Sequence, residues 1–95
     1  MASINARSEE IIFHGLVQGV GFRTTAARHA RHHELRGWVR NDPQGTVTAM
    51  VQGLGNGIEA WLECIEGSLP GHVARIQRRE LPGTDEFAAF RILRS

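Results

Sequence analysis

The stretch Gly15-Leu16-Val17-Gln18-Gly19-Val20-Gly21-Phe22-Arg23 follows an apolar run and leads into a segment with helical periodicity. Its glycines at 19 and 21 permit positive φ and leave backbone N–H groups uncovered, so several donors can converge on one point. The first turn of the following helix adds unpaired N–H groups and the positive end of its dipole. Arg23 supplies a planar cation for phosphate or carboxylate oxygens. The stretch predicts an anion-binding loop. Glycines of this kind, taken alone, more often indicate a tight turn with a surface arginine.

Apolar periodicity on both sides of this loop predicts the elements that it joins. The run 11–16 is apolar and predicts a central strand that ends at the loop. Apolar residues recur every four positions from Phe22, so we expect an amphipathic helix over 23–33. Its alanines are small, which favours close packing of this helix on a sheet.

A hairpin is predicted next, with strands over 36–41 and 46–52. They are joined by Asp42-Pro43-Gln44-Gly45, in which proline presets φ at the first central turn position and glycine completes the reversal. Apolar and polar residues alternate along 46–52, so this strand is expected to have one core face and one mixed face.

A second helix is predicted by apolar residues from Ile58 to Ile65 at the spacing i, i+3, i+4 and i+7. Gly67 suits its C-terminal cap, and Pro70 prevents its continuation. Residues 72–81 and 86–93 supply the last extended segments.

The resulting order is βαββαβ with an added C-terminal strand. Alternation in the segment 72–81 is imperfect around Val73 and Ile76, which predicts a bulge or a shifted register there. Right-handed crossovers place both helices on one face of an antiparallel sheet of four to five strands, with the first and third strands central. The expected fold class is therefore a ferredoxin-like α+β sandwich.

A second motif accompanies the glycine loop: Gly37-Trp38-Val39-Arg40-Asn41, then Gly45-Thr46-Val47 and a later glycine, Gly53. The two motifs, at their spacing, resemble the acylphosphatase family, and Phe90-Arg91-Ile92 is similar to its closing strand. The resemblance spans roughly residues 9 to 93 and implies the same ferredoxin-like fold. It also implies an enzyme that hydrolyses the carboxyl–phosphate bond of small acyl phosphates to carboxylate and inorganic phosphate.

Acyl phosphate hydrolysis suits a site built from a backbone loop and one arginine. Its leaving group is a carboxylate whose conjugate acid has a pKa near ~4, so it departs without protonation at neutral pH. Positioning and charge neutralisation can then supply most of the catalysis, without a metal. The absence of lysine, with 11 arginines as the only permanent cations, also excludes lysine-based phosphate or Schiff-base chemistry.

Individual roles follow from the resemblance. It implies that Arg23 and the loop amides bind the phosphoryl group, that Asn41 orients the attacking water, and that a phosphate oxygen takes the water's proton. For Asn41 the alternative is a turn residue, because Asn-Asp-Pro favours turn initiation. The expected catalytic residues are Arg23 and Asn41, and the expected phosphate-binding residues are Gln18, Gly19, Val20, Gly21, Phe22 and Arg23.

Three positions depart from the family's pattern: Thr24 replaces the usual aromatic, Gln44 the usual acid before the hairpin glycine, and Glu34 an expected glycine after the first helix. None removes a catalytic group, but Thr24 lies where the acyl part would enter. We therefore expect the function to be kept, and the sequence leaves the specificity for the acyl group open.

Composition limits the other possibilities. The 95 residues, 41% hydrophobic, are expected to form one domain over 9–95 after a flexible segment 1–8. There is no apolar run of membrane length, and the first eight residues lack an apolar signal core. The single Cys64 cannot form an internal disulfide and is expected to pack in the second helix, so a cytoplasmic protein is predicted. Nothing in the sequence requires more than a monomer. The net charge of +1 lacks the strong positive excess that is typical of nucleic-acid-binding domains, so neither a nucleic-acid nor a membrane partner is expected.

No cofactor or metal is expected either. His29, His32 and His33 have helical spacing, but Glu34 is the only carboxylate nearby, so exposed histidines on a helix flank are the favoured interpretation. The expected ligands are a small acyl phosphate, with inorganic phosphate or sulfate as competing anions.

Two alternatives stay open. One is a non-catalytic or carbamoyl-phosphate-binding module, because acylphosphatase-like domains also occur inside larger maturation enzymes. The other is an RNA-binding domain on the same βαββαβ plan, which would need aromatic residues on the exposed sheet strands and a basic surface.

Overall fold

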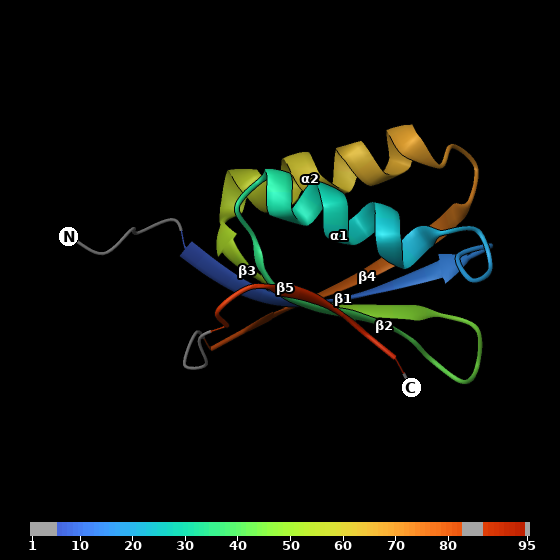
Figure 1. The fold of residues 1–95 in the computed structure, drawn as a ribbon, viewed down its shortest axis with the longest axis horizontal. Coiled ribbons are helices and arrows are strands. Elements are labelled where there is room, and N and C mark those ends of the chain that lie inside the picture. Colours follow the sequence, from blue (N-terminus) through green and yellow to red (C-terminus); the bar gives the residue numbers. More distant parts are fainter. Residues whose placement is uncertain (1–5, 83–86, 95) are drawn as a thin grey trace.

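The computed structural model describes residues 6–82 and 87–94, which form a five-stranded sheet and two helices (Figure 1). The elements in chain order are β1 (Ala6–Gly15), α1 (Phe22–His32), β2 (Arg36–Asn41), β3 (Val47–Leu54), α2 (Gly55–Ser68), β4 (Val73–Leu81) and β5 (Phe90–Leu93). Residues 6–8, expected to be flexible, are instead the first residues of β1. Residues 1–5 of that segment lie outside the described part of the chain.

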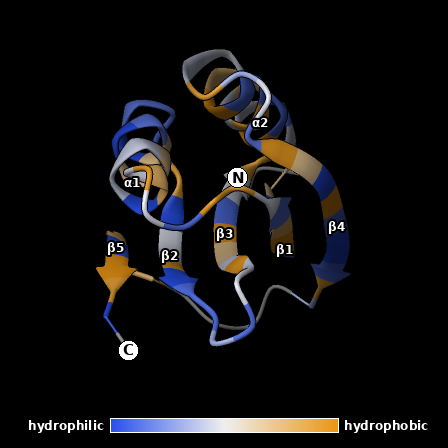
Figure 2. Cartoon of the chain, turned by 90° about the vertical axis from the view of Figure 1, so that its right-hand side faces the viewer, coloured by the Kyte–Doolittle hydropathy of each residue, from blue (hydrophilic) through white to orange (hydrophobic). Residues whose placement is uncertain are grey.

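The strands follow the order β4-β1-β3-β2-β5, as Figure 2 shows. The predicted ferredoxin-like arrangement is confirmed, and β1 and β3 are interior strands. The pairs β1–β3, β1–β4 and β2–β3 are antiparallel, but β5 runs parallel to β2, so the sheet is mixed rather than purely antiparallel. The reason is topological: β4 ends at the end of the sheet where β2 begins, so a strand that starts there must run in the direction of β2.

Both helices cover the same face of the sheet, and the core lies between them and the strands (Figure 1). Trp61 of α2 is fully buried, and its ring packs edge-on against Phe13 of β1 and Phe90 of β5. Its indole N–H donates to the carbonyl oxygen of Ala26 in α1 at 2.9 Å, which satisfies the one polar atom of this large side chain. Trp61 thus joins both helices and two strands.

The helix ends differ from one another. After α1 the amides of Glu34 and Leu35 donate to the carbonyl oxygens of Arg31 (3.1 Å) and Ala30 (2.8 Å), the hydrogen-bond pattern of a Schellman cap. Glu34 is in the left-handed conformation, with φ of 58°. The cap predicted at Gly67 is wrong, because α2 continues through this residue to Ser68.

The predicted irregularity in β4 is a register shift beside the glycine loop. His14 pairs with Arg75 but Gly15 pairs with Val73, so β4 has one extra residue at this point. Gly15 has φ of 129°, and a Cβ atom there would lie 2.3 Å from the carbonyl oxygen of His72. The close approach of the two backbones fixes where the loop leaves the sheet. No helix in the described part of the chain is long and apolar enough to cross a membrane.

Candidate active site

The glycine loop connects the end of β1 to the first turn of α1. Gly19 and Gly21 have φ of 78° and 76°, and no atom would crowd a Cβ at either position. These glycines are therefore required for their backbone conformation rather than for space. Gly21 is the N-cap of α1, where no side chain caps the helix and the first turn has no acidic residue. The N-terminal amides of α1 are thus left to an external anion or to solvent.

Beside this loop lies a cavity of about 130 Å³. Arg23 of α1 and Asn41 at the end of β2 both line it, so the fold brings together the two residues predicted to be catalytic. Gln18 and Val20 do not line it, and Val20 is exposed. The lining residues are Val17, Gly19, Gly21, Phe22, Arg23, Thr24 and Asn41.

Arg23 is half-buried and is held by the edge strand β5. Its Nη1 atom donates to the main-chain carbonyl of Leu93 in β5 at 2.9 Å. This bond uses one of the five N–H donors of the guanidinium, and the others remain for an anion. Because the contact joins residues from opposite ends of the chain, no sequence pattern near Arg23 indicated it.

Gln18 connects the loop to the β2–β3 turn. Its side-chain Nε2 donates to the carbonyl oxygens of Asp42 at 2.8 Å and Thr46 at 2.9 Å. The predicted turn over 42–45 is closed by the amide of Gly45, which donates to the carbonyl of Asp42 at 3.1 Å. Since Asn41 directly precedes Asp42, the side chain of Gln18 sets the position of the loop relative to Asn41.

The side chain of Asp42, in the same turn, is 8% exposed. It accepts hydrogen bonds from the hydroxyls of Thr48 (2.7 Å) and Thr46 (2.8 Å) and from the guanidinium of Arg40 (3.2 Å). Burial alone would raise the pKa of Asp42, but the bonds from Thr48, Thr46 and Arg40 outweigh it, so the pKa lies below its ordinary value. From the sequence Asp42 was expected only as a turn residue and not as a buried carboxylate, and the one available signal was an acid between Asn41 and Pro43.

The histidines of α1 are engaged separately. His29 lies 2.8 Å from the hydroxyl of Ser68, and His33 lies 3.4 Å from the sulfur of Cys64. Burial, together with the positive charge of Arg28 and the neighbouring histidines, lowers the pKa of His29. Within residues 6–82 and 87–94, no three His, Cys, Asp or Glu side chains are grouped so that they could hold a metal ion.

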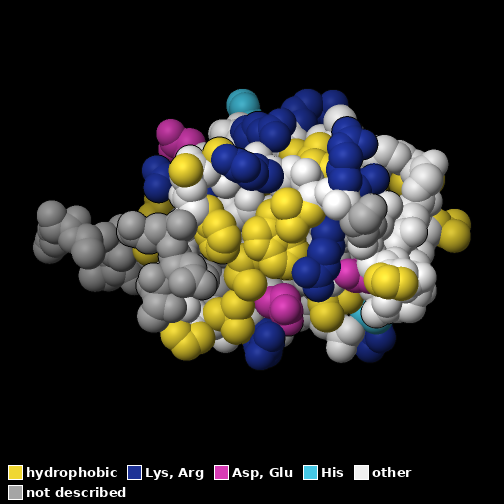
Figure 3. Space-filling view, turned by 60° about the horizontal axis from the view of Figure 1, so that its bottom comes forward, with side chains coloured by type: hydrophobic (Ala, Val, Ile, Leu, Met, Phe, Trp, Pro, Cys, Tyr) yellow, Lys and Arg dark blue, Asp and Glu magenta, His cyan; other side chains and the backbone are white. Residues whose placement is uncertain are grey.

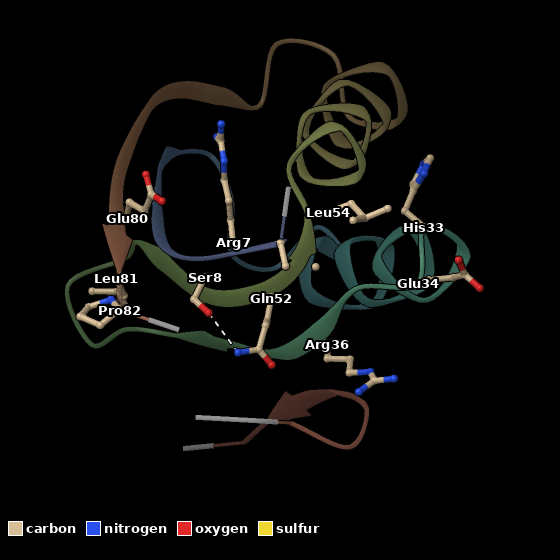
Figure 4. Close-up of a pocket in the computed structure, with 12 residues that line it drawn as sticks. Arg7, Ser8, His33, Glu34, Arg36, Gln52, Leu54, Glu80, Leu81 and Pro82 are labelled. Carbon is tan, nitrogen blue, oxygen red and sulfur yellow. Dashed lines mark hydrogen bonds between the residues drawn. The ribbon is translucent and has the colours of Figure 1, made fainter. Parts of the chain in front are cut away.

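A larger, open depression of about 770 Å³ lies at the opposite end of the sheet, near the start of β1 (Figure 4). Figure 4 shows the side chain of Gln52 donating to Ser8, with Arg7 and Glu80 to one side and Arg36 to the other. Its lining thus mixes positive and negative groups and lacks the glycine loop and helix N-terminus of the smaller cavity.

Comparisons with known proteins agree with this geometry. The family model for acylphosphatase matches residues 9–92. An acylphosphatase from Methylococcus capsulatus is 39% identical over 85 residues, which cover 88% of this chain and 92% of that protein. One from Burkholderia thailandensis is 42% identical over 79 residues, covering 80% of this chain and 79% of that protein. The chain therefore belongs to the acylphosphatase family.

Solved structures show the same relationship. The crystal structure of acylphosphatase from Bacillus subtilis has a TM-score of 0.83 and 31% identity, covering 90% of this chain and 97% of that one. The structure of HypF from T. kodakarensis has a TM-score of 0.80 and 31% identity, but the match covers 92% of this chain and only 12% of that one. The chain is an acylphosphatase, a hydrolase that acts on phosphorus-containing acid anhydrides, and its substrates are small acyl phosphates.

Proposed function

We propose that the chain hydrolyses acyl phosphates without a metal, as a monomer in the cytoplasm, with a single domain over 9–95. Arg23 and the amides of 18–22 bind the phosphoryl group, and Asn41 orients the attacking water. The observation that carries this proposal is the cavity in which Arg23, Asn41 and the N-terminus of α1 meet.

The proposed reaction needs no protein base. Water attacks phosphorus, the bond from phosphorus to the acyl oxygen breaks, and the electron pair leaves with the carboxylate. The proton of the water passes to a phosphate oxygen. Charge on the phosphoryl oxygens is met by the guanidinium of Arg23 and by backbone donors, which are already in place before the reaction. The amide of Asn41, with two donors and one acceptor, holds the water in line.

Thr24 is proposed to contact the acyl part of the substrate. It is exposed and lines the cavity directly after Arg23, on the first turn of α1. A threonine leaves more room than an aromatic side chain, so bulky acyl groups should be accepted. The alternative of a non-catalytic or carbamoyl-phosphate-binding module would keep the phosphate contacts and show no turnover.

The test is phosphate release from benzoyl phosphate, measured with and without excess EDTA. Turnover should be the same in both, because Arg23 and the loop amides replace the metal as the electrophile. Added inorganic phosphate or sulfate should inhibit competitively, and sedimentation should give the monomer mass. Loss of turnover in EDTA with recovery on addition of Mg²⁺ would contradict metal independence, and anion binding without turnover would favour the non-catalytic module.

A further inference from the structure

The sheet face opposite the helices has no helix over it, and its middle is apolar (Figure 3). Alternation along each strand determines which side chains lie on this open face. In the register of the sheet, Trp38 of β2 is opposite Met50 of β3, and Ile12 of β1 is opposite Thr48 of β3. Trp38, Met50 and Ile12 are each half-buried and form the apolar centre.

Arginines surround this centre. Figure 3 shows dark blue groups around the yellow middle of the face. Among the described residues the strands place five arginines on the open face and two carboxylates, Glu10 and Asp42, on it or at its edge, an excess of three positive charges (five minus two). The five arginines are Arg36, Arg40, Arg75, Arg79 and Arg91.

The charge of the whole chain hides this excess. The net charge is +1, but the exposed residues of α2, on the other side of the molecule, include Glu59, Glu63 and Glu66. Six arginines and six carboxylates are described off this face and balance one another, so the positive excess of the described residues lies on the open face. The absence of a nucleic-acid partner was predicted from the net charge, and net charge does not report such a local excess.

Two of the five arginines have no partner within residues 6–82 and 87–94. Arg79 pairs with Glu10 at 3.0 Å, and Arg40 pairs with Asp42 at 3.2 Å. The side chains of Arg36 and Arg91 make no ion pair or hydrogen bond with the described residues. Both are exposed and flank Trp38: Arg36 lies two residues before it on β2, and Arg91 is its register partner on β5.

Trp38 places an aromatic ring on this face. The guanidinium carbon of Arg40 lies 4.9 Å from the centre of its ring, so a cation and an aromatic ring already form one platform. Flat π-faces of this kind stack with nucleobases irrespective of sequence. An aromatic platform between two arginines that have no partner among the described residues is typical of a surface for single-stranded nucleic acid.

We infer that the open sheet face, through Arg36, Trp38 and Arg91, binds single-stranded nucleic acid, with bases stacked on the Trp38–Arg40 platform and phosphates held by Arg36 and Arg91. A membrane fits less well, because Trp38, Met50 and Ile12 are half-buried in a flat sheet and do not protrude into a lipid interface. An acidic protein surface would use the arginines but leaves the aromatic platform without a function. None of the three residues lines the acyl phosphate cavity, so this binding is independent of hydrolysis.

The first test is fluorescence anisotropy with a labelled oligouridylate of about 15 nucleotides. Binding should appear at about 50 mM salt and weaken steeply as salt rises. The double variant Arg36→Ala/Arg91→Ala should bind at least about tenfold more weakly. Its plot of log affinity against log salt should be shallower by about 1.4, since each phosphate contact to a single strand contributes about 0.7. Arg28→Ala, an exposed arginine of α1, is the matched control and should bind as the parent does.

The second test separates stacking from charge. The chain has two tryptophans, and Trp61 is fully buried, so quenching on addition of oligouridylate should report Trp38. Trp38→Leu should abolish the quenching and weaken binding, and circular dichroism and phosphate release should verify that each variant is folded. Saturating inorganic phosphate should leave the binding unchanged.

Four outcomes would overturn the inference. The first is the absence of binding at low salt, and the second is an equal loss of affinity in Arg28→Ala and in the double variant. The third is binding of heparin as tight as that of oligouridylate, with no change in the emission of Trp38. The fourth is tighter binding to vesicles of equal parts phosphatidylserine and phosphatidylcholine, which would assign the face to a membrane.

Discussion

The side chain of Gln18 donates to the main-chain carbonyl of Asp42 at 2.8 Å, and this bond joins the glycine loop to the turn that follows Asn41. The loop belongs to the β1–α1 connection and the turn to the β2–β3 hairpin, so neither local segment could hold the two halves of the site together. Through this bond Gln18 positions the proposed phosphate-binding amides relative to the proposed water-orienting amide.

Gln18→Ala should therefore lower both stability and turnover. The substitution removes a donor from two main-chain carbonyls, which should lower the free energy of unfolding by about 1 to 3 kcal/mol. The loop can then shift relative to Asn41, and kcat should fall by at least about tenfold, since small misplacements in a positioned site are costly. Urea unfolding and phosphate release measure the two effects. Gln44→Ala, exposed on the same hairpin, is the control, and equal effects in both variants would exclude a positioning role for Gln18.

Asp42→Asn should remove an acid-sensitive part of the stability. The pKa of Asp42 is lower in the folded protein than in the unfolded chain. Its ionised carboxylate therefore adds to the free energy of unfolding at pH values above the unfolded-state pKa, and this contribution is lost as the pH falls through the folded-state pKa. Urea unfolding at a series of pH values should show this loss below about pH 4 in the parent protein and less of it in Asp42→Asn. Thr48→Val removes a donor to the charged form and should raise the folded-state pKa of Asp42 toward the unfolded value, so its acid-dependent loss of stability should be smaller and should be complete at a higher pH. An acid profile identical in all three proteins would contradict this account.

Glu34→Gly should stabilise the protein. Glu34 has φ of 58°, a conformation that costs a residue with a Cβ atom more than it costs glycine. Glycine also loses more conformational entropy on folding, so the expected net gain is about 0.5 to 1 kcal/mol. Denaturant midpoints measure it, with Glu34→Ala as the matched control because alanine keeps the strain. A gain in Glu34→Ala equal to that in Glu34→Gly would show that removal of the charge, not the backbone conformation, is responsible.

Arg23→Ala and Asn41→Ala should fail in different ways. Arg23 is proposed to contact the phosphoryl group before and during reaction, so substrate binding, inhibition by phosphate and turnover should all be lost in Arg23→Ala. Asn41→Ala should keep inhibition by phosphate while kcat falls by ~100-fold or more, because one lost orienting group is worth ~2.7 to 4 kcal/mol in the transition state. Steady-state kinetics with phosphate as inhibitor separates the two patterns. Turnover near the parent rate in a folded Asn41→Ala variant would show that Asn41 is a turn residue and does not orient the attacking water.

Much of the fold follows from signals within short segments of the sequence. Gly19 and Gly21 have positive φ in the loop, and Gly45 closes the turn over 42–45, as their positions predicted. The helices and the hairpin follow from the period of their apolar residues. These features depend on steric limits and spacing within a few residues, so they need no knowledge of the rest of the chain.

Other features were decided by contacts between distant parts of the chain. Gly67 resembled a cap, but α2 continues through it to Ser68, whose hydroxyl lies 2.8 Å from His29 of α1. The donors of Gln18, the bond from Arg23 to Leu93 and the parallel pairing of β5 join segments far apart in sequence. The gathering of Arg36 and Arg91 around Trp38 likewise depends on strand order and register. No local periodicity encodes which strands become neighbours, because strand order is determined by the burial of the whole core. Strand order in turn determines which side chains meet at the site and on the open face.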